Sequence, residues 1–209
     1  MSHSVLLIRH GQSLHNADGN SFSGVSDVKM DEIGYAQCRR LTAFFERCPV
    51  DRVFASPLHR ARESARLIFP SHWEDLGIAH WLTEFDYGNY EGKRPIDLGD
   101  DTIISQWNTT PAELVFPGGD SIREHAEQTY TAFLAFAGSL SPNARVACVT
   151  HRTTMRLLVA RIIGLDLNRF RKVPCSNCAV TDVRFDTKRA PYLHALNVSP
   201  EYTDQGKVG

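Results

Sequence analysis

The 209-residue sequence predicts an α/β fold. Two observations support this. Residues 5–8 (V-L-L-I) and 146–149 (V-A-C-V) are apolar without polar alternation, which is typical of strands covered on both faces. Strand-like and helix-like segments also alternate along the chain, which is typical of stacked α and β layers. The length suits one domain, spanning residues 1–209, that buries most of its apolar surface.

The individual elements follow from local patterns. Residues 32–47 carry an apolar stripe at the helical period. Residues 119–138 have Asp120 or Ser121 as the N-cap and Gly138 as the stop signal. We expect strands at 4–9, 52–55, 78–83, 145–150, 178–186 and, more weakly, 192–197. We expect helices at 32–47, 58–69, 119–138 and 152–164.

Two segments fit no regular element. Residues 92–118 form the one long irregular insertion, and substrate-selecting segments are often drawn from such stretches. The tail after residue 199 is polar and is expected to be frayed.

Composition limits the classes of partner. A formal net charge of −1 argues against a dedicated nucleic-acid or membrane surface. No stretch approaches the roughly 20 apolar residues of a membrane-spanning helix. The first predicted strand starts almost at once, so we expect no cleavable signal and a cytoplasmic location. Nothing in the sequence indicates an oligomeric state.

The cysteines and the missing motifs bear on cofactors. An odd count of five cysteines fits reduced thiols. Cys175 and Cys178 have C-x-x-C spacing, which permits a metal or redox site, but no second Cys/His pair accompanies them and we favour core packing. A phosphate-binding loop of the form G-x-x-x-x-G-K-[ST] is missing, so ATP is not expected. We expect neither a metal nor a cofactor.

The first strand runs directly into Arg9, His10 and Gly11. Ligands in open α/β sheets bind beyond the carboxyl ends of the strands, where these residues lie. Gly11 would allow the backbone to approach a ligand closely.

Three further segments deliver chemistry-bearing side chains in turn. Arg60 opens a helix after Ser56-Pro57, Glu84 follows the apolar stretch 78–82, and His151 ends the strand 145–150. A turn, F-P-G-G-D-S at 116–121, stands between the last two.

This series resembles the histidine phosphatase superfamily, which includes phosphoglycerate mutase and the acid phosphatases. The resemblance runs from about residue 4 to 186. It also covers Q-S-x-x-N at 12–16, F-S-G at 22–24 and D-E-I-G-Y-A-Q at 31–37. It implies a three-layer α/β/α sandwich around a mixed, mostly parallel sheet.

Each of these residues has chemistry suited to phosphoryl transfer. His10 is the candidate nucleophile, held by a hydrogen bond from its other ring nitrogen to a backbone carbonyl, with a pKa lowered by neighbouring arginines. Arg9 and Arg60 match phosphate oxygens in pairs, and His151 would serve a third oxygen. Glu84 is the candidate general acid.

Substrate contacts are less specific. The resemblance implies that Ser13, Asn16, Ser23, Gly24 and Tyr87 contact substrate, although Asn16 also fits simple turn chemistry. Most relatives have glycine after the second catalytic histidine, where this chain has Arg152. Arg152 would either clamp a carboxylate or second phosphate of the substrate or point to solvent, and both alternatives stay open.

The predicted function is hydrolysis of a small phosphomonoester through a phosphohistidine on His10. One alternative is a phosphoglycerate-type mutase, and another is a phosphoprotein phosphatase or regulatory binding module on the same fold. Residues 95–118 contain no Lys or Arg, which argues against the mutase. They hold acids that would repel a second anionic group, namely Asp97, Asp100, Asp101 and Glu113.

Overall fold

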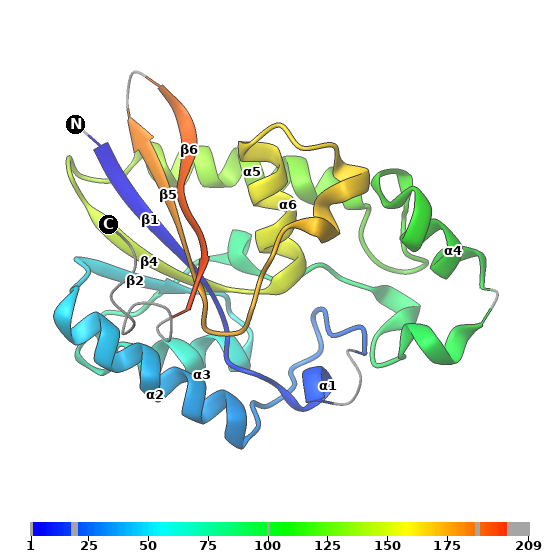
Figure 1. Cartoon of the computed structure of the whole chain (residues 1–209), viewed down its shortest axis with the longest axis horizontal. Helices are drawn as coiled ribbons and strands as arrows, with labels where there is room; N and C mark the ends of the chain where they lie inside the picture. The colour runs from blue at the N-terminus through cyan, green and yellow to red at the C-terminus, as the bar shows by residue number, and fades with distance from the viewer. Residues whose placement is uncertain (1, 18–20, 100, 187–188, 200–209) are drawn as a thin grey trace.

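The computed structural model describes residues 2–17, 21–99, 101–186 and 189–199, and it contains a six-stranded mixed sheet in the order β3-β2-β4-β1-β5-β6 (Figure 1). Strand β4 pairs in parallel with both β1 and β2, and β2 also pairs in parallel with β3. Strand β5 pairs antiparallel with both β1 and β6. The strands are β1 (Ser2–Arg9), β2 (Arg52–Ala55), β3 (Gly77–Ile78), β4 (Arg145–Thr150), β5 (Val180–Asp186) and β6 (Arg189–Val198).

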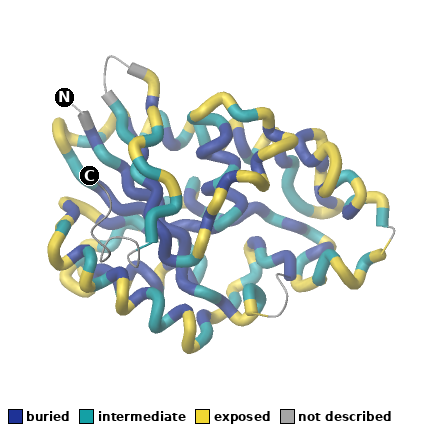
Figure 2. Tube along the Cα trace, in the orientation of Figure 1, coloured by how far each residue is buried: buried dark blue, intermediate teal, exposed yellow. Residues whose placement is uncertain are grey.

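Helices cover both faces of this sheet. In Figure 1, α2 and α3 lie below it and α5 and α6 above it. Leu6 and Ile8 of β1 pack in the cluster formed with α2 and α3, while Val5 and Leu7 pack with α5 and α6. The strands that carry these residues are the dark core in Figure 2, and the predicted three-layer sandwich is confirmed. The helices are α2 (Glu32–Arg47), α3 (His59–Ile68), α5 (Ile122–Gly138) and α6 (Arg152–Ile162).

The prediction of an irregular insertion was wrong in part. Asp101 caps a helix, α4 (Thr102–Thr109), by accepting hydrogen bonds from the N–H groups of Ile103 and Ile104. Trp107 on α4 packs edge-to-face on Phe116, with ring centroids 5.6 Å apart. The insertion therefore packs into a hydrophobic cluster that it shares with residues of α5, α6 and the 3₁₀ helix at 167–172, and it lies at the right of Figure 1, away from the sheet.

Several short helices connect these elements. A four-residue helix, α1 (Leu14–Ala17), follows β1. Single turns of 3₁₀ helix lie at η1 (Pro70–His72), η2 (His80–Leu82), η3 (Gly88–Tyr90), η4 (Pro95–Leu98) and η5 (Pro111–Glu113), with a longer one at η6 (Leu167–Lys172).

Two predicted strands needed correction. The chain leaves the sheet after Ile78, because Ala79 makes the last bond to β2, from its N–H to the Ala55 carbonyl (2.9 Å), and η2 follows. Apolar Leu82 is buried in this turn rather than in a strand. The strand expected at 178–186 also starts later than expected. Cys178 has a left-handed backbone (φ 54°), so β5 begins at Val180. The tail after residue 199 is outside the described residues.

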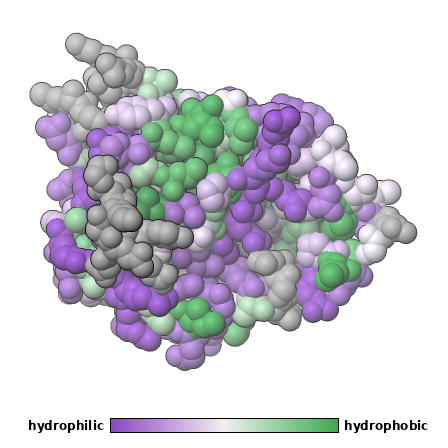
Figure 3. Space-filling view, viewed as in Figure 1, coloured by the Kyte–Doolittle hydropathy of each residue, from purple (hydrophilic) through white to green (hydrophobic). Residues whose placement is uncertain are grey.

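The surface in Figure 3 is mostly hydrophilic, and its hydrophobic side chains gather over the region of β6 and α6. Within the described ranges, no helix has both the length and the hydropathy that crossing a membrane requires.

Candidate active site

The sheet register brings the candidate residues to one edge. Arg9 of β1 is level with Thr150 of β4, and Ala55 of β2 is level with Val149. The next residues along each strand therefore emerge together at the carboxyl edge. The rings of His10 and His151 lie 5.0 Å apart there, measured between their centroids.

His10 is fixed through both ring nitrogens. Its Nδ1 lies 2.6 Å from the Gly11 carbonyl, a contact that requires the hydrogen on Nδ1, and Arg60 Nε donates to Nε2 (3.3 Å). The lone pair is thus on Nε2. Burial lowers the pKa of His10 well below its ordinary value, and Arg60 and Arg9 add to this effect. The expected carbonyl contact and the expected lowered pKa are both confirmed.

Arg60 is fully buried and held by backbone carbonyls. It donates to Ser26 O (2.7 Å) and Gly24 O (2.6 Å), and burial lowers its pKa. Glu91 holds the same loop from the other side, accepting from the N–H of Gly24 (3.0 Å) and from the Ser26 hydroxyl. Sequence patterns did not indicate this role of Glu91.

The loop 175–178 makes hydrogen bonds with both Arg9 and His10. Arg9 Nη1 donates to Cys175 O (2.9 Å), and Asn177 Nδ2 donates to His10 O (2.8 Å). Burial lowers the pKa of Arg9 to about 10. The thiol of Cys178 lies 3.6 Å from that of Cys38, while Cys175 Sγ faces Met155. The C-x-x-C segment is therefore packed into the core, and all five cysteines are free thiols.

Glu84 lies at the N-terminus of α6. Its Oε1 accepts from the N–H groups of Phe85 (3.0 Å) and Thr154 (2.9 Å), and its Oε2 accepts from the N–H of Thr153 (3.0 Å). These otherwise unpaired N-terminal amides of the helix fix the position of both carboxyl oxygens of Glu84.

His151 is the N-cap residue of α6. Its Nε2 lies 2.8 Å from the hydroxyl of Ser56, which also belongs to this edge. Burial lowers its pKa well below the ordinary value, with further contributions from Arg60, His10 and Arg9. Both histidines are therefore neutral around pH 7.

Several buried donors of this edge have no hydrogen-bond partner among the described residues. They are Arg9 Nε, His151 Nδ1 and the hydroxyls of Ser13 and Ser23. Buried polar atoms are normally paired, so unpaired ones need an explanation. An oxyanion offers several acceptor lone pairs and fits donors of this kind.

The other predicted substrate residues make contacts within the protein. Asn16 Oδ1 accepts from the N–H of Ser13 (3.3 Å), which is turn chemistry. The Tyr87 hydroxyl is 2.6 Å from Thr153 Oγ1 and buried, and burial raises its pKa. At Gly24 a Cβ atom would stand 2.1 Å from the Phe85 carbonyl oxygen, so this position has no room for a side chain.

Gly11 lies against α2. A Cβ there would meet the backbone oxygen of Gly34 at 2.7 Å, so the glycine lets that helix pack against the end of β1. The expected close approach of this backbone to a ligand stays a prediction.

Arg152 begins α6 and is half-buried beside other arginines. After burial, Arg60 and Arg9, it also contributes to the low pKa of His10. Arg156 lies one helical turn further and donates to Val173 O (2.8 Å), and Arg171 of η6 donates to Trp107 O (3.0 Å). Burial lowers the pKa of Arg171, and the charge of Arg152 lowers it further.

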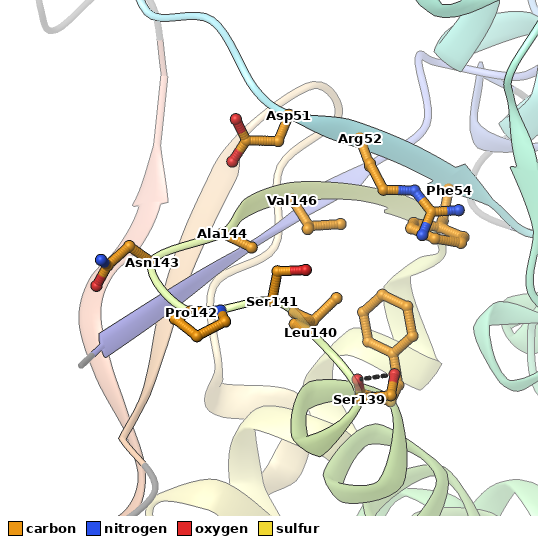
Figure 4. Close-up of a pocket in the computed structure, with 11 residues that line it drawn as sticks. Asp51, Arg52, Phe54, Ser139, Leu140, Ser141, Pro142, Asn143, Ala144 and Val146 are labelled. Carbon is orange, nitrogen blue, oxygen red and sulfur yellow. Dashed lines mark hydrogen bonds between the residues drawn. The ribbon is translucent and has the colours of Figure 1, made fainter.

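Within the described part of the chain, no group of three or more His, Cys, Asp or Glu side chains is placed to hold a metal ion. A hollow of about 570 Å³ lies at the opposite, amino-terminal edge of β2 and β4 (Figure 4). Asp51, Arg52 and Phe54 line it, and none of the five candidate catalytic residues does.

Comparisons with known proteins agree with this fold. Phosphoserine phosphatase 1 of Hydrogenobacter thermophilus is 25% identical over 203 residues, covering 93% of this chain and 92% of the relative. The 2-carboxy-D-arabinitol-1-phosphatase of Triticum aestivum is 30% identical over 207 residues, covering 94% of this chain but 41% of that protein. The crystal structure of an Entamoeba histolytica phosphoserine phosphatase with 3-phosphoglyceric acid superposes with a TM-score of 0.83, at 20% identity, covering 94% and 98% of the two chains.

The family model described as histidine phosphatase superfamily, branch 1, matches residues 5–199. Because this match covers nearly the whole chain, the protein belongs to the histidine phosphatase superfamily.

Proposed function

We propose that this enzyme hydrolyses a small phosphomonoester through a phosphohistidine on His10. The observation that carries the proposal is the state of the His10 ring, which has its hydrogen on Nδ1 and its lone pair on Nε2 beside two buried arginines. A neutral imidazole is the nucleophilic form. The low pKa caused by burial, Arg60 and Arg9 keeps that form populated at neutral pH.

The remaining groups divide the other tasks. Arg9 and Arg60 neutralise the charge of the phosphoryl oxygens, and neutral His151 orients one of these oxygens by a hydrogen bond. Charge stabilisation and positioning are the main requirements of this reaction. Oε2 of Glu84 accepts one hydrogen bond, from the Thr153 N–H, among the described residues, so it is the oxygen that protonates the leaving alkoxide and later takes a proton from water. The phosphohistidine bond to Nε2 forms as the ester oxygen leaves, and water then breaks it to release phosphate.

Rapid quench with a ³²P-labelled substrate tests this proposal. We expect label on the protein that is labile in acid and stable in alkali. Label on serine or cysteine would overturn it. Since Arg9 and Arg60 supply the positive charge, p-nitrophenyl phosphate hydrolysis should survive exhaustive EDTA treatment. Loss of activity on chelation, restored by a divalent ion, would contradict the assignment of charge.

The substrate is proposed to carry a second anionic group. Arg152, Arg156 and Arg171 extend the positive charge away from His10 along α6 and η6, which favours the clamp alternative for Arg152. The named activities of the relatives, on phosphoserine and carboxyarabinitol 1-phosphate, agree with a carboxylate. A panel of phosphate esters with and without a carboxylate tests this, and Arg152→Ala should raise KM for the carboxylated members alone.

A phosphoglycerate-type mutase remains the second candidate because of the same arginines. Asp97 pairs with Arg94 (2.6 Å) and Glu113 pairs with Arg123, which weakens the expected repulsion of a second anionic group by these two acids. Asp101 caps α4, and Asp100 is outside the described residues. Incubation with 3-phosphoglycerate and a trace of 2,3-bisphosphoglycerate separates the two functions. A phosphatase releases inorganic phosphate or does nothing, whereas a mutase forms 2-phosphoglycerate.

A further inference from the structure

A chain of hydrogen-bonded side chains leads from the surface to Glu84. Asp120 Oδ2 lies 3.1 Å from His125 Nδ1, and His125 Nε2 lies 3.0 Å from Thr154 Oγ1. The Thr154 hydroxyl in turn lies 3.1 Å from Glu84 Oε1. The chain joins the first turn of α5 to the first turn of α6.

Asp120, at the outer end of this series of hydrogen bonds, is partly exposed to solvent and is held by a backbone N–H. Asp120 is 42% exposed at its side chain, against 13% for His125. Its Oδ2 also accepts from the N–H of Asp86 (3.0 Å). Burial raises the pKa of Asp120, but the hydrogen bonds from His125 and Asp86 outweigh it and the net pKa is lowered. Asp120 is therefore a carboxylate, and His125 Nδ1 must carry the hydrogen that it accepts.

The inner end fixes a hydroxyl that has one proton and three neighbours. Besides His125 and Glu84, the Thr83 carbonyl lies 2.7 Å from Thr154 Oγ1. The contact of 3.0 Å between His125 Nε2 and Thr154 Oγ1 fixes the position of this hydroxyl, whichever of the two atoms donates.

Thr154 also holds Glu84 through its backbone. The same carboxylate oxygen, Oε1, accepts from the Thr154 N–H at 2.9 Å. The orientation of Oε1 thus depends on Thr154 at two points, and it determines where Oε2 points, because the two oxygens share one carboxyl plane.

We propose that His125 is a positioning residue for the acid of this reaction: held by Asp120, it fixes Thr154, and Thr154 directs the second carboxylate oxygen of Glu84, Oε2, to the leaving group. This inference rests on the proposed role of Glu84 as general acid. Ring packing alone does not require a histidine, because the contact with Phe85, at 5.3 Å between ring centroids, is equally open to phenylalanine.

Leaving-group dependence tests the proposal, because an ester with a good leaving group needs little proton assistance. Glycerol 2-phosphate is the poor leaving group and p-nitrophenyl phosphate the good one. His125→Phe should lower kcat for glycerol 2-phosphate about tenfold, the effect of one lost hydrogen bond, and change kcat for p-nitrophenyl phosphate by less than about twofold. Thr154→Val should give the same split.

Two further variants exclude a merely structural effect. His125→Gln places an amide nitrogen near the position of Nε2 and should restore most of the lost rate on glycerol 2-phosphate. His194→Phe alters an exposed histidine on β6 and should leave both rates unchanged. Thermal denaturation of each variant reports whether the fold is retained.

A Glu84→Gln background separates this inference from the proposed function. In that background His125→Phe should cause no further loss, because the group it positions is gone. Equal losses on both substrates, or an undiminished loss in the Glu84→Gln background, would overturn the role of His125 alone. If Glu84→Gln itself lowers both rates equally, Glu84 is not the acid, and the inference about His125 fails with it.

Discussion

The two edges of the central sheet carry arginines in opposite environments. At the carboxyl edge, Arg9 and Arg60 are almost completely buried. At the amino edge, Arg52 is exposed and stacks over the Phe54 ring, 4.9 Å from its centroid, beside the hollow in Figure 4. Arg145 there donates to the carbonyls of Cys48 and Pro49, and its backbone N–H donates to Asp51.

The difference shows what marks a site in this fold. Both edges have charged residues, and the amino edge has the roomy hollow. Only the carboxyl edge concentrates buried cations and neutral histidines whose pKa values are displaced from their ordinary ranges. Burying like charges together costs free energy, and a bound phosphate dianion offsets that cost. The functional edge is thus recognised by unfavourable electrostatics rather than by cavity volume.

The largest expected effect comes from removing the nucleophile at the carboxyl edge. His10→Ala leaves the phosphate pocket but no imidazole to form the covalent bond. We expect kcat to fall by as much as about 10⁶-fold, as for a covalent nucleophile in other hydrolases. Steady-state hydrolysis of p-nitrophenyl phosphate measures this. Turnover near the wild-type rate would exclude the phosphohistidine route.

A lysine at Arg60 compares the two edges directly. Arg60→Lys keeps the charge but loses the planar group that contacts Ser26, Gly24 and His10 at once. We expect kcat/KM to fall about 10²–10³-fold, the effect of losing one preorganised donor in an active site. The matched variant at the amino edge, Arg52→Lys, should change kcat/KM by less than about twofold. Similar losses in both variants would remove the distinction between the edges.

A smaller effect is expected from Glu91, which acts on the carboxyl edge only through the loop 23–26. Glu91→Gln halves the acceptor capacity that holds Gly24 and Ser26, while Arg60 keeps its own charge. We expect kcat/KM to fall about tenfold and the free energy of unfolding to fall by about 1–3 kcal/mol, as for a weakened buried hydrogen-bond group. Urea denaturation and steady-state kinetics measure the two quantities. An unchanged activity would show that the loop keeps its position without Glu91.

The sequence was sufficient for the parts of this edge that depend on local pattern. Apolar strands without alternation, followed by His10 and His151, predicted the central strands and their functional ends. The strand expected at 78–83 was wrong because an apolar run is equally suited to a buried turn, and only the pairing of Ala79 with Ala55 ends the strand there. The apolar pattern alone does not indicate where the hydrogen bonds between neighbouring strands end.

The residues that sequence patterns missed act across long separations. Glu91 holds a loop 65 to 67 residues away, and His125 meets Thr154 across 29 residues. Neither has a motif of its own, because the requirement for each arises only when two distant segments are brought together. Asp101 was a local signal that could have been used, since an N-cap followed by Ile104 and Trp107 marks α4.

The smallest predicted effect is a pH dependence of stability confined to the carboxyl edge. Burial, with Arg60 and other charges, places the folded-state pKa values of His10 and His151 well below that of an unfolded histidine, about 6.5. Below that pH the unfolded chain binds more protons than the folded one, so stability falls as pH falls and is fully present only above about pH 6.5. We expect the melting temperature to decline from pH 7.5 to pH 5, and His10→Gln and His151→Gln to flatten that decline, most of all in combination. Exposed His194 supplies the control, because His194→Gln should leave the slope unchanged. If the double variant at the carboxyl edge keeps the wild-type slope, the two imidazoles are not the buried neutral groups that set this edge apart.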